Sequence, residues 1–388
     1  MALLFISGFE LDFSVSSSGG NAVLGIAESL CSHVDEDVYF ICHHDGASFP
    51  KGRFWISGSN DIWNGRKIRY MSTLNIKIIK TLYWGWQCKQ LIRKWAKQHK
   101  GEPLHVLTYN TYHPSISVIH RICKSIGAKH HAILYDLGVP PKRLGLSYLS
   151  MLGYRIAERT AEKFIPLLDG RIVINELICK HYAPGKDYIL VDGGINQNII
   201  KHLFSLEEKK GDIFTFVLAG MLWDQNGTKL VLDTMTHYDN PNVRVVFAGK
   251  GNDVHLIETL AEKDNRISYV GMLNMDDLFK LYEEADVLLN LRLEEEVDFH
   301  FPGKLLEYLA TGRYVISTPV AHAERDYGNY MSILHDKTPE GLMNMMEYVQ
   351  KLGKHYLYKT GIKARNFMLE NRNWQFQTDR MLEYIKRK

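Results

Sequence analysis

Three charged side chains in the second half of the sequence have the types and spacing to bind a phosphorylated ligand. Lys304 and Glu307 are three residues apart, so in a helix they share one face. A cation in the first turn opposes the helix dipole, and a bound phosphate would explain it. Arg292 supplies a second cation, and Glu307 could accept hydrogen bonds from two ribose hydroxyls. Alternatively, Lys304 and Glu307 form an exposed ion pair of little energetic value.

Residues 286–319 contain the pattern that would position these side chains. Apolar runs at 287–289 and 314–317 predict two strands. Between them lie a polar loop with three glutamates, 294–296, and a helical pattern that Gly312 ends. Ligands of parallel α/β sheets bind beyond the carboxyl ends of the strands, where the charged side chains fall.

The whole chain repeats this alternation of strands and helices. Its 388 residues exceed what one core usually accommodates, so two domains are expected. Expected strands lie at 3–7, 38–42, 104–108, 131–135, 171–175, 188–191, 214–219, 244–248, 267–270, 286–289 and 314–317. Expected helices lie at 21–32, 115–126, 228–236, 254–263 and 276–284, and 342–388 is helical throughout. This order predicts an α/β protein with two Rossmann-like, doubly wound domains facing a cleft.

The domain change is expected near residues 193–211, which include a charged linker. We therefore predict a first domain at 1–195 and a second domain at 196–370, with the candidate phosphate-binding side chains in the second. A final helix, 371–388, is expected to return to the first domain.

Composition restricts the class of protein. No stretch approaches 18 apolar residues, so no membrane span is expected. The apolar start at 1–9 predicts a buried strand. Five scattered cysteines without C-x-x-C spacing favour a reducing cytosol. The acidic triplet 35–37 has D-x-D form but reads as a turn, and no cluster predicts a metal site.

Glycine-containing turns add possible anion sites in the second half. The loop 220–227 precedes a predicted helix, whose N-terminal amides could bind an anion. The alternative is an ordinary turn with Thr228 near the N-cap. A similar turn at 248–251 is weak evidence alone, and 270–272 could place backbone groups against a base.

The run FPGKLLEYLATGRYVIST, residues 301–318, resembles the F-P-S-K-x-x-E-Y-x-A-x-G-x-P-V signature of sugar-nucleotide-dependent glycosyltransferases. These are GT-B fold enzymes of the large retaining family 4, many of them in bacterial polysaccharide biosynthesis. The similarity extends upstream to the loop at 220–229 and covers most of the second half. Residues 193–195 also resemble the linker of that family.

The resemblance implies a role for each matching residue. Lys304 and Arg292 would bind the donor diphosphate, with Lys229 as a further cation. Glu307 would bind the ribose. Gly19 and Gly20, in a serine- and glycine-rich first loop, would approach the same diphosphate; the alternative is a flexible β–α loop. Val270 and Met272 would flank the base, and Asp298, Phe301 and Gly303 would face the donor sugar. The expected donor is a UDP-sugar, with no cofactor and no metal.

Two positions depart from the family pattern. The family has two glutamates, and the position of the first falls on Phe299, beside Asp298. The family often has a basic residue just after the first strand of this domain, and here Met221 or Leu222 takes its place. Lys229 is the candidate to supply the missing positive charge.

Catalytic candidates come from the first half. Asp136 and His131 bracket a predicted strand, and Asp136 at its carboxyl end could orient or deprotonate an acceptor hydroxyl. His113 and His130 are alternatives, although a single histidine is more often structural.

The segment 66–100 is strongly basic, with ten lysines and arginines, no acids and three tryptophans. An amphipathic basic helix of this kind predicts binding to an anionic membrane surface, and 142–159 adds apolar residues between basic ends. The alternative is a helix that packs its apolar face on the sheet. No recognition motif accompanies the charge, so nucleic acid is not an expected partner.

These observations predict a glycosyltransferase of the hexosyltransferase type that acts in polysaccharide or glycolipid assembly. It would be cytoplasmic and peripheral to the inner face of the cell membrane, and would use a lipid-linked or saccharide acceptor. Two alternatives remain: another GT-B enzyme such as a sugar-nucleotide epimerase, and a non-catalytic partner subunit that binds a nucleotide sugar.

Overall fold

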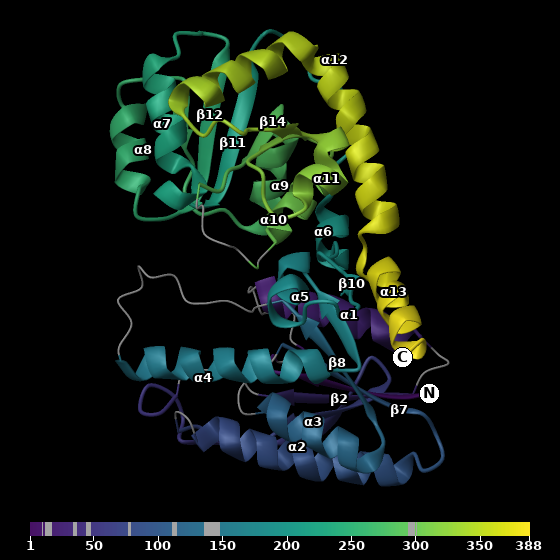
Figure 1. Cartoon of the computed structure of the whole chain (residues 1–388). Helices are drawn as coiled ribbons and strands as arrows, with labels where there is room; N and C mark the ends of the chain where they lie inside the picture. Colours follow the sequence, from purple (N-terminus) through teal and green to yellow (C-terminus); the bar gives the residue numbers. More distant parts are fainter. Residues whose placement is uncertain are drawn as a thin grey trace. The chain divides into compact units, whose positions relative to one another are not determined.

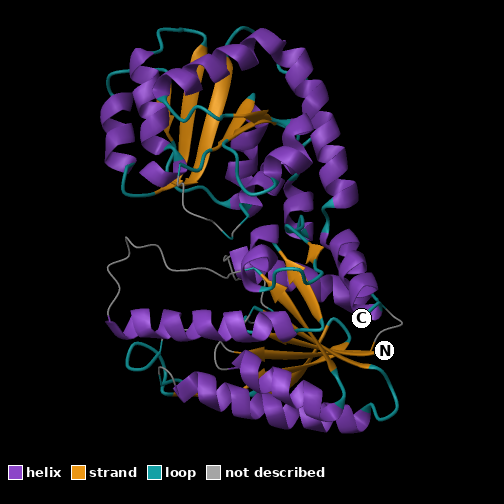
Figure 2. Cartoon of the chain, viewed as in Figure 1, coloured by secondary structure: helices purple, strands orange, loops and turns teal. Residues whose placement is uncertain are grey.

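The computed structural model describes residues 1–9, 11, 18–33, 37–43, 48–76, 79–110, 115–135, 148–293, 299 and 301–388. The chain divides into two compact units (Figures 1 and 2). The first contains residues 1–193, 299–301 and 374–388; the second contains 194–298 and 302–373.

The first unit is built on a sheet with the strand order β10-β9-β8-β7-β1-β2-β5-β4. Its strands are β1 (Ala2–Ser7), β2 (Asp37–His43), β4 (Ser59–Trp63), β5 (Arg66–Met71), β7 (Leu104–Tyr109), β8 (Lys129–Leu134), β9 (Gly170–Val173) and β10 (Ile189–Leu190). All neighbours are parallel except β4, which pairs antiparallel with β5. The short strands β3 (Trp55–Ile56) and β6 (Thr73–Leu74) form a separate ribbon.

Helices cover both faces of this sheet (Figure 1). They are α1 (Ser18–Ser32), α2 (Ile79–Gln98), α3 (Ser115–Ile126), α4 (Tyr148–Phe164), α5 (Glu176–Tyr182) and α13 (Trp374–Lys386), with a 3₁₀ turn at Ile165–Leu167. One core joins α1 and α13 to the sheet, and another joins α2 and α3 to the opposite face. A Cβ at Gly25 would overlap the Trp374 indole, so α1 and α13 approach closely at this glycine.

The second unit has the strand order β13-β12-β11-β14-β15-β16, all parallel. Its strands are β11 (Phe214–Met221), β12 (Val243–Lys250), β13 (Ile267–Tyr269), β14 (Val287–Asn290), β15 (Tyr314–Ser317) and β16 (Ser332–Ile333). Its helices are α6 (Gln197–His202), α7 (Thr228–His237), α8 (Val254–Ala261), α9 (Met275–Glu284), α10 (Gly303–Thr311), α11 (Ala323–Tyr327) and α12 (Pro339–Asn371), with 3₁₀ turns at Asp224–Asn226 and Gly328–Tyr330. The chain direction across the sheet reverses between β11 and β14, and ligands of such folds bind at this switch point.

The predicted α/β class with two doubly wound domains is confirmed. Two local predictions were wrong. Helix α1 begins at Ser18, so Gly19 and Gly20 lie in its first turn and not in a loop. The segment 66–100 is not one helix, because 66–71 is the strand β5 and only 79–98 is helical. Among the described residues, no helix combines the length and apolar character needed to cross a bilayer.

Candidate functional site

The candidate site lies at the switch point of the second unit. Gly220 is near the carboxyl end of β11, and Arg292 follows the carboxyl end of the neighbouring strand β14. The next helix, α10, begins at Gly303 and carries Lys304 and Glu307 in its first turns. The strand order therefore gathers residues that are far apart in sequence.

The ammonium group of Lys304 is held against the end of β11. Its Nζ donates a hydrogen bond to the Ala219 carbonyl and lies 5.9 Å from the centre of the Tyr308 ring. Gly220 has φ +117°, and a Cβ there would overlap this Nζ. A glycine is thus needed at position 220 for two reasons, the backbone conformation and the room for the ammonium group.

Burial gives Lys304 and Glu307 opposite pKa shifts. Burial lowers the pKa of Lys304, the Glu307 carboxylate opposes this, and the positive charge of Arg292 lowers it further. Burial raises the pKa of Glu307, while Lys304 and a hydrogen bond from Tyr282 oppose the shift. Two cations thus share one half-buried place, and an anion bound there would stabilise both.

Two tyrosines that the sequence analysis did not select complete the surroundings of Glu307. The Tyr282 hydroxyl hydrogen-bonds to the Glu307 carboxylate, and the Tyr282 and Tyr308 rings pack edge to face with centroids 5.4 Å apart. The Tyr308 hydroxyl lies 3.4 Å from the Ala219 carbonyl that also accepts from Lys304. Tyr308 belongs to the K-x-x-E-Y run and could have been found there; Tyr282 had no such signal.

The backbone after β14 is fixed by the strand beside it. The Arg292 N–H donates to Thr318 Oγ1 at 2.8 Å, just beyond β15. The Leu293 N–H donates to the Gln225 carbonyl at 2.9 Å. These two bonds fix the backbone at Arg292 and therefore the position from which its side chain reaches the site.

The turns after β11 and β12 touch at paired glycines. Gly220 and Gly249 are register partners, and a Cβ at Gly249 would overlap the Gly220 carbonyl. The Tyr269 hydroxyl donates to the Gly249 carbonyl at 2.8 Å. Beyond this contact Val270 is 43% exposed and Met272 is 65% exposed, so both have apolar surface available to a planar base.

The remaining predicted site residues of the second half of the chain differ in accessibility. Lys229 is exposed at the start of α7 and forms an ion pair with Asp224 at 3.7 Å. Phe301 is buried, whereas Gly303 is exposed as the first residue of α10. Phe299, which occupies the place of the first family glutamate, packs in a core of the first unit with ring centroids 5.7 Å from Tyr182.

His131, predicted at the edge of a strand, lies inside β8 and is completely buried. Its Nε2 lies 3.0 Å from His105 Nδ1, and burial lowers the pKa of His131 to about 3. A side chain without exposed surface contacts no acceptor in this conformation, so we do not carry His131 into the proposed mechanism. Asp136, His113, Asp298 and the glutamates 294–296 lie outside the described residues.

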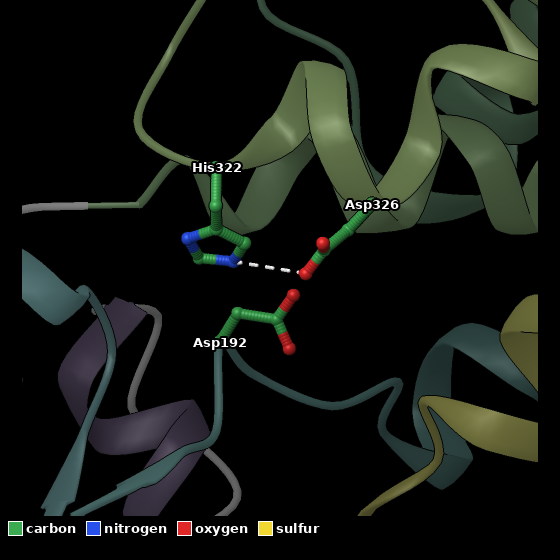
Figure 3. A group of neighbouring side chains, drawn as sticks. All are labelled: Asp192, His322 and Asp326. Carbon is green, nitrogen blue, oxygen red and sulfur yellow. Dashed lines mark ion pairs between the residues drawn. The ribbon is translucent and has the colours of Figure 1, made fainter.

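A further ionisable pair follows β15. His322 is buried just before α11, and its Nε2 lies 4.0 Å from Asp326 Oδ2 (Figure 3). The sequence analysis did not identify this pair, because one histidine and one aspartate four residues apart are common on helices.

The family model for "Glycosyl transferases group 1" matches residues 213–350. The matched region contains β11 to α10 and hence the candidate site, but it is less than half of the chain. No curated protein sequence matches this chain.

Solved structures share the fold over the full length. Sucrose-phosphate synthase from Thermosynechococcus elongatus is 13% identical with a TM-score of 0.66, over 100% of this chain and 99% of that one. An E. coli trehalose-6-phosphate structure bound with UDP-2-fluoro glucose is 9% identical with a TM-score of 0.68, over 100% and 99%. Anabaena Alr3699/HepE in complex with UDP is 13% identical with a TM-score of 0.65, over 100% of both chains. The chain therefore has the GT-B fold, and residues 213–350 of its second half match the group 1 glycosyltransferase model.

Proposed function

We propose that this protein is a glycosyltransferase that moves a sugar from a nucleoside diphosphate donor to an acceptor hydroxyl. One observation carries the proposal: Lys304, Arg292 and Glu307 gather at the switch point of a Rossmann-like unit, with the Lys304 ammonium held over Gly220. The match to the glycosyltransferase group 1 model and the UDP complexes among the structural neighbours support it.

In this proposal the two cations bind the donor diphosphate. The leaving diphosphate gains negative charge as the glycosidic bond to the donor breaks, and Lys304 and Arg292 stabilise that charge. Glu307, oriented by Tyr282, accepts hydrogen bonds from the ribose. Val270 and Met272 flank the base, uracil in the expected UDP-sugar. Transfer with retention, and without a metal, stays a proposal.

Further residues are proposed to contact the donor sugar, the acceptor hydroxyl and the donor phosphate. Gly303 is exposed beside Lys304 and suits close approach of the donor sugar. Asp136 remains the proposed group that orients or deprotonates the acceptor. The positive end of the α1 dipole, in whose first turn Gly19 and Gly20 lie, offers a further place of positive potential for phosphate oxygens.

We further propose that the acceptor is presented at an anionic membrane surface in polysaccharide or glycolipid assembly, on the cytoplasmic side. Helix α2 buries Trp84 and Trp95 against the sheet, as the alternative interpretation expected. Its exposed face nevertheless carries Ile79, Leu82 and Trp86 at helical spacing, 43%, 58% and 56% exposed. The same face continues with Lys89, Arg93 and Lys97, which suits contact with acidic headgroups.

A panel of uridine, guanosine and adenosine diphosphate sugars, tested by thermal shift and by hydrolysis, examines the proposed function. Binding of one donor class together with slow hydrolysis or transfer is the expected result. No stabilisation by any member would remove the proposal.

A non-catalytic nucleotide-sugar-binding subunit is the second candidate, because an apolar Phe299 occupies the place of an acidic family residue. It predicts binding in the same panel without any turnover, including in the presence of lipid-linked and saccharide acceptors.

A further inference from the structure

A groove with a volume of about 1190 Å³ lies at one edge of the first unit. Its floor is formed by β2, β5 and β4, and its wall by the second half of α2. The groove exists because the β4–β5 hairpin extends the sheet beyond the part that α2 covers. In this hairpin Asn60 pairs with Arg69 and Ile62 with Lys67, so these four side chains share a face of the sheet.

Positive charge dominates the groove. Arg66, Lys67, Arg69 and Lys94 line it together with a single acid, Asp61. The two guanidinium groups donate to neutral oxygens: Arg66 to the His33 carbonyl at 2.7 Å, and Arg69 to Asn60 Oδ1 at 3.1 Å. Strand alternation places Lys67 and Arg69 on the face that α2 packs against, whereas Arg66 and Asp61 point to the other face. Three cations, Lys67, Arg69 and Lys94, therefore share the groove, and they indicate an anionic ligand.

The groove also offers neutral groups that suit hydroxyls and apolar faces. Gln98, on α2, adds an exposed amide that can exchange hydrogen bonds with ligand hydroxyls. Tyr39 and Leu91 add half-buried apolar surface. Trp95 closes the wall but is 2% exposed, so its indole N–H does not reach a ligand.

The position separates this groove from the candidate donor and acceptor sites. Val38 and Tyr39 lie at the amino end of β2, and Arg66 and Lys67 at the amino end of the parallel strand β5. Ligands of parallel α/β sheets bind at the carboxyl ends. The groove is therefore a second site and not an extension of the first.

We propose that this groove binds an acidic oligosaccharide, whose carboxylate or phosphate groups meet the cations Lys67, Arg69 and Lys94 and whose hydroxyls meet the Gln98 amide. The volume exceeds the ~300–1,000 Å³ of usual small-molecule pockets, which suits several linked sugar units. A concave groove also suits a chain better than the flat surface of a bilayer. The proposal rests on the proposed function, since a transferase that extends an acidic glycan would hold the distant part of its acceptor here.

The test measures binding of a fluorescent oligogalacturonate to the full-length protein by anisotropy, with an uncharged maltooligosaccharide as the neutral probe. Wild type should bind the acidic chain and not the neutral one. The double variant Lys67→Glu/Lys94→Glu should weaken binding by about tenfold or more. Lys163→Glu is the control, because Lys163 is an exposed cation on α4 that does not line the groove. It should change affinity by less than about twofold.

Three outcomes would overturn the proposal: no binding of the acidic chain, equal binding of the neutral chain, or equal weakening by Lys163→Glu. Phosphatidylglycerol vesicles form a separate arm. If vesicles bind through Lys67 and Lys94 while the oligosaccharide does not, the groove recognises a lipid surface and the saccharide assignment is wrong. Thermal shift with nucleotide sugars should be the same in wild type and variants, so failure here is distinguishable from failure of the proposed transferase.

Discussion

At the scale of single residues, the account depends on how an ammonium group is held beside a strand end. Lys304 contacts the Ala219 carbonyl and the Tyr308 ring, and Gly220 leaves the room it occupies. Among the described residues, the Glu307 carboxylate opposes the effect of burial by raising the pKa of Lys304. A bound diphosphate is expected to stabilise the half-buried cations Lys304 and Arg292, because its negative charge offsets their mutual repulsion.

Replacing Lys304 with alanine should weaken nucleotide-sugar binding by about tenfold to a hundredfold, because a hydrogen bond to a charged group contributes ~1.5–3 kcal/mol. Titration calorimetry measures the change. Lys280→Ala is the control, since Lys280 is exposed on α9 and already paired with Asp277. Equal affinities of Lys304→Ala and wild type would exclude Lys304 from the donor site.

Gly220→Ala should reduce both stability and donor binding. A non-glycine residue at φ +117° is strained, by about 1–3 kcal/mol, and the added Cβ would displace the Lys304 ammonium. Gly211→Ala is the matched control: its φ is +86°, but nothing lies within 4 Å of its Cβ position. Urea unfolding and donor titration of both variants check this. If Gly211→Ala also weakened donor binding, backbone strain alone would explain the effect.

These residue contacts were only partly predictable. Lys304, Glu307 and Arg292 could be selected from charge and spacing, but the contact of Lys304 with Gly220 and the role of Tyr282 could not. They depend on which strands are neighbours, and the reversal between β11 and β14 is not visible in the order of elements along the chain. The predicted position of His131 at the edge of a strand was wrong for a related reason. His131 is buried where it stacks on His105 of the adjacent strand, and the order of residues does not show which strand is adjacent.

At the scale of elements, most strands and helices of the second unit could be predicted to within a few residues, but α6, α11 and β16 were missed. Its strands are continuous apolar runs and its helices begin and end at capping residues, such as Asn274 before α9 and Gly312 after α10. The strands between 55 and 74 were missed. They are short, exposed and polar, and a pattern without a buried face gives little periodicity to detect.

The exposed apolar face of α2 gives a prediction at this scale. Leu82→Glu/Trp86→Glu should reduce co-sedimentation with anionic vesicles by more than about tenfold and leave unfolding unchanged, because both side chains are more than half exposed. Leu177→Glu on α5, also exposed, should have no effect on vesicle binding. Unchanged sedimentation of the double variant would count against membrane contact through α2.

At the scale of the whole molecule, buried histidines couple the fold to pH. Burial, with the nearby His120 and His131, lowers the pKa of His130 to about 3, and burial and His105 do the same for His131. Both are neutral when folded but take up protons below about pH 6.5 when unfolded. Their contribution is therefore complete above that pH and is lost as the pH falls toward 3.

Chemical unfolding between pH 7 and 4 should show a stability loss that steepens below pH 6.5, by up to ~1.4 kcal/mol per pH unit for each histidine. His131→Gln should flatten this dependence even if it lowers stability overall. His237→Gln, at an exposed position, should not change the slope. A pH profile in which both variants matched wild type would show that His131 does not determine the acid sensitivity.

The central claim is that the second unit binds a nucleoside diphosphate sugar through Lys304, Arg292 and Glu307. Calorimetric titration of wild type and Lys304→Ala with UDP-, GDP- and ADP-sugars tests it most directly. The account predicts saturable binding of one donor class by wild type and at least tenfold weaker binding by the variant. Wild type that binds none of these donors, or a variant that binds as tightly as wild type, would contradict it.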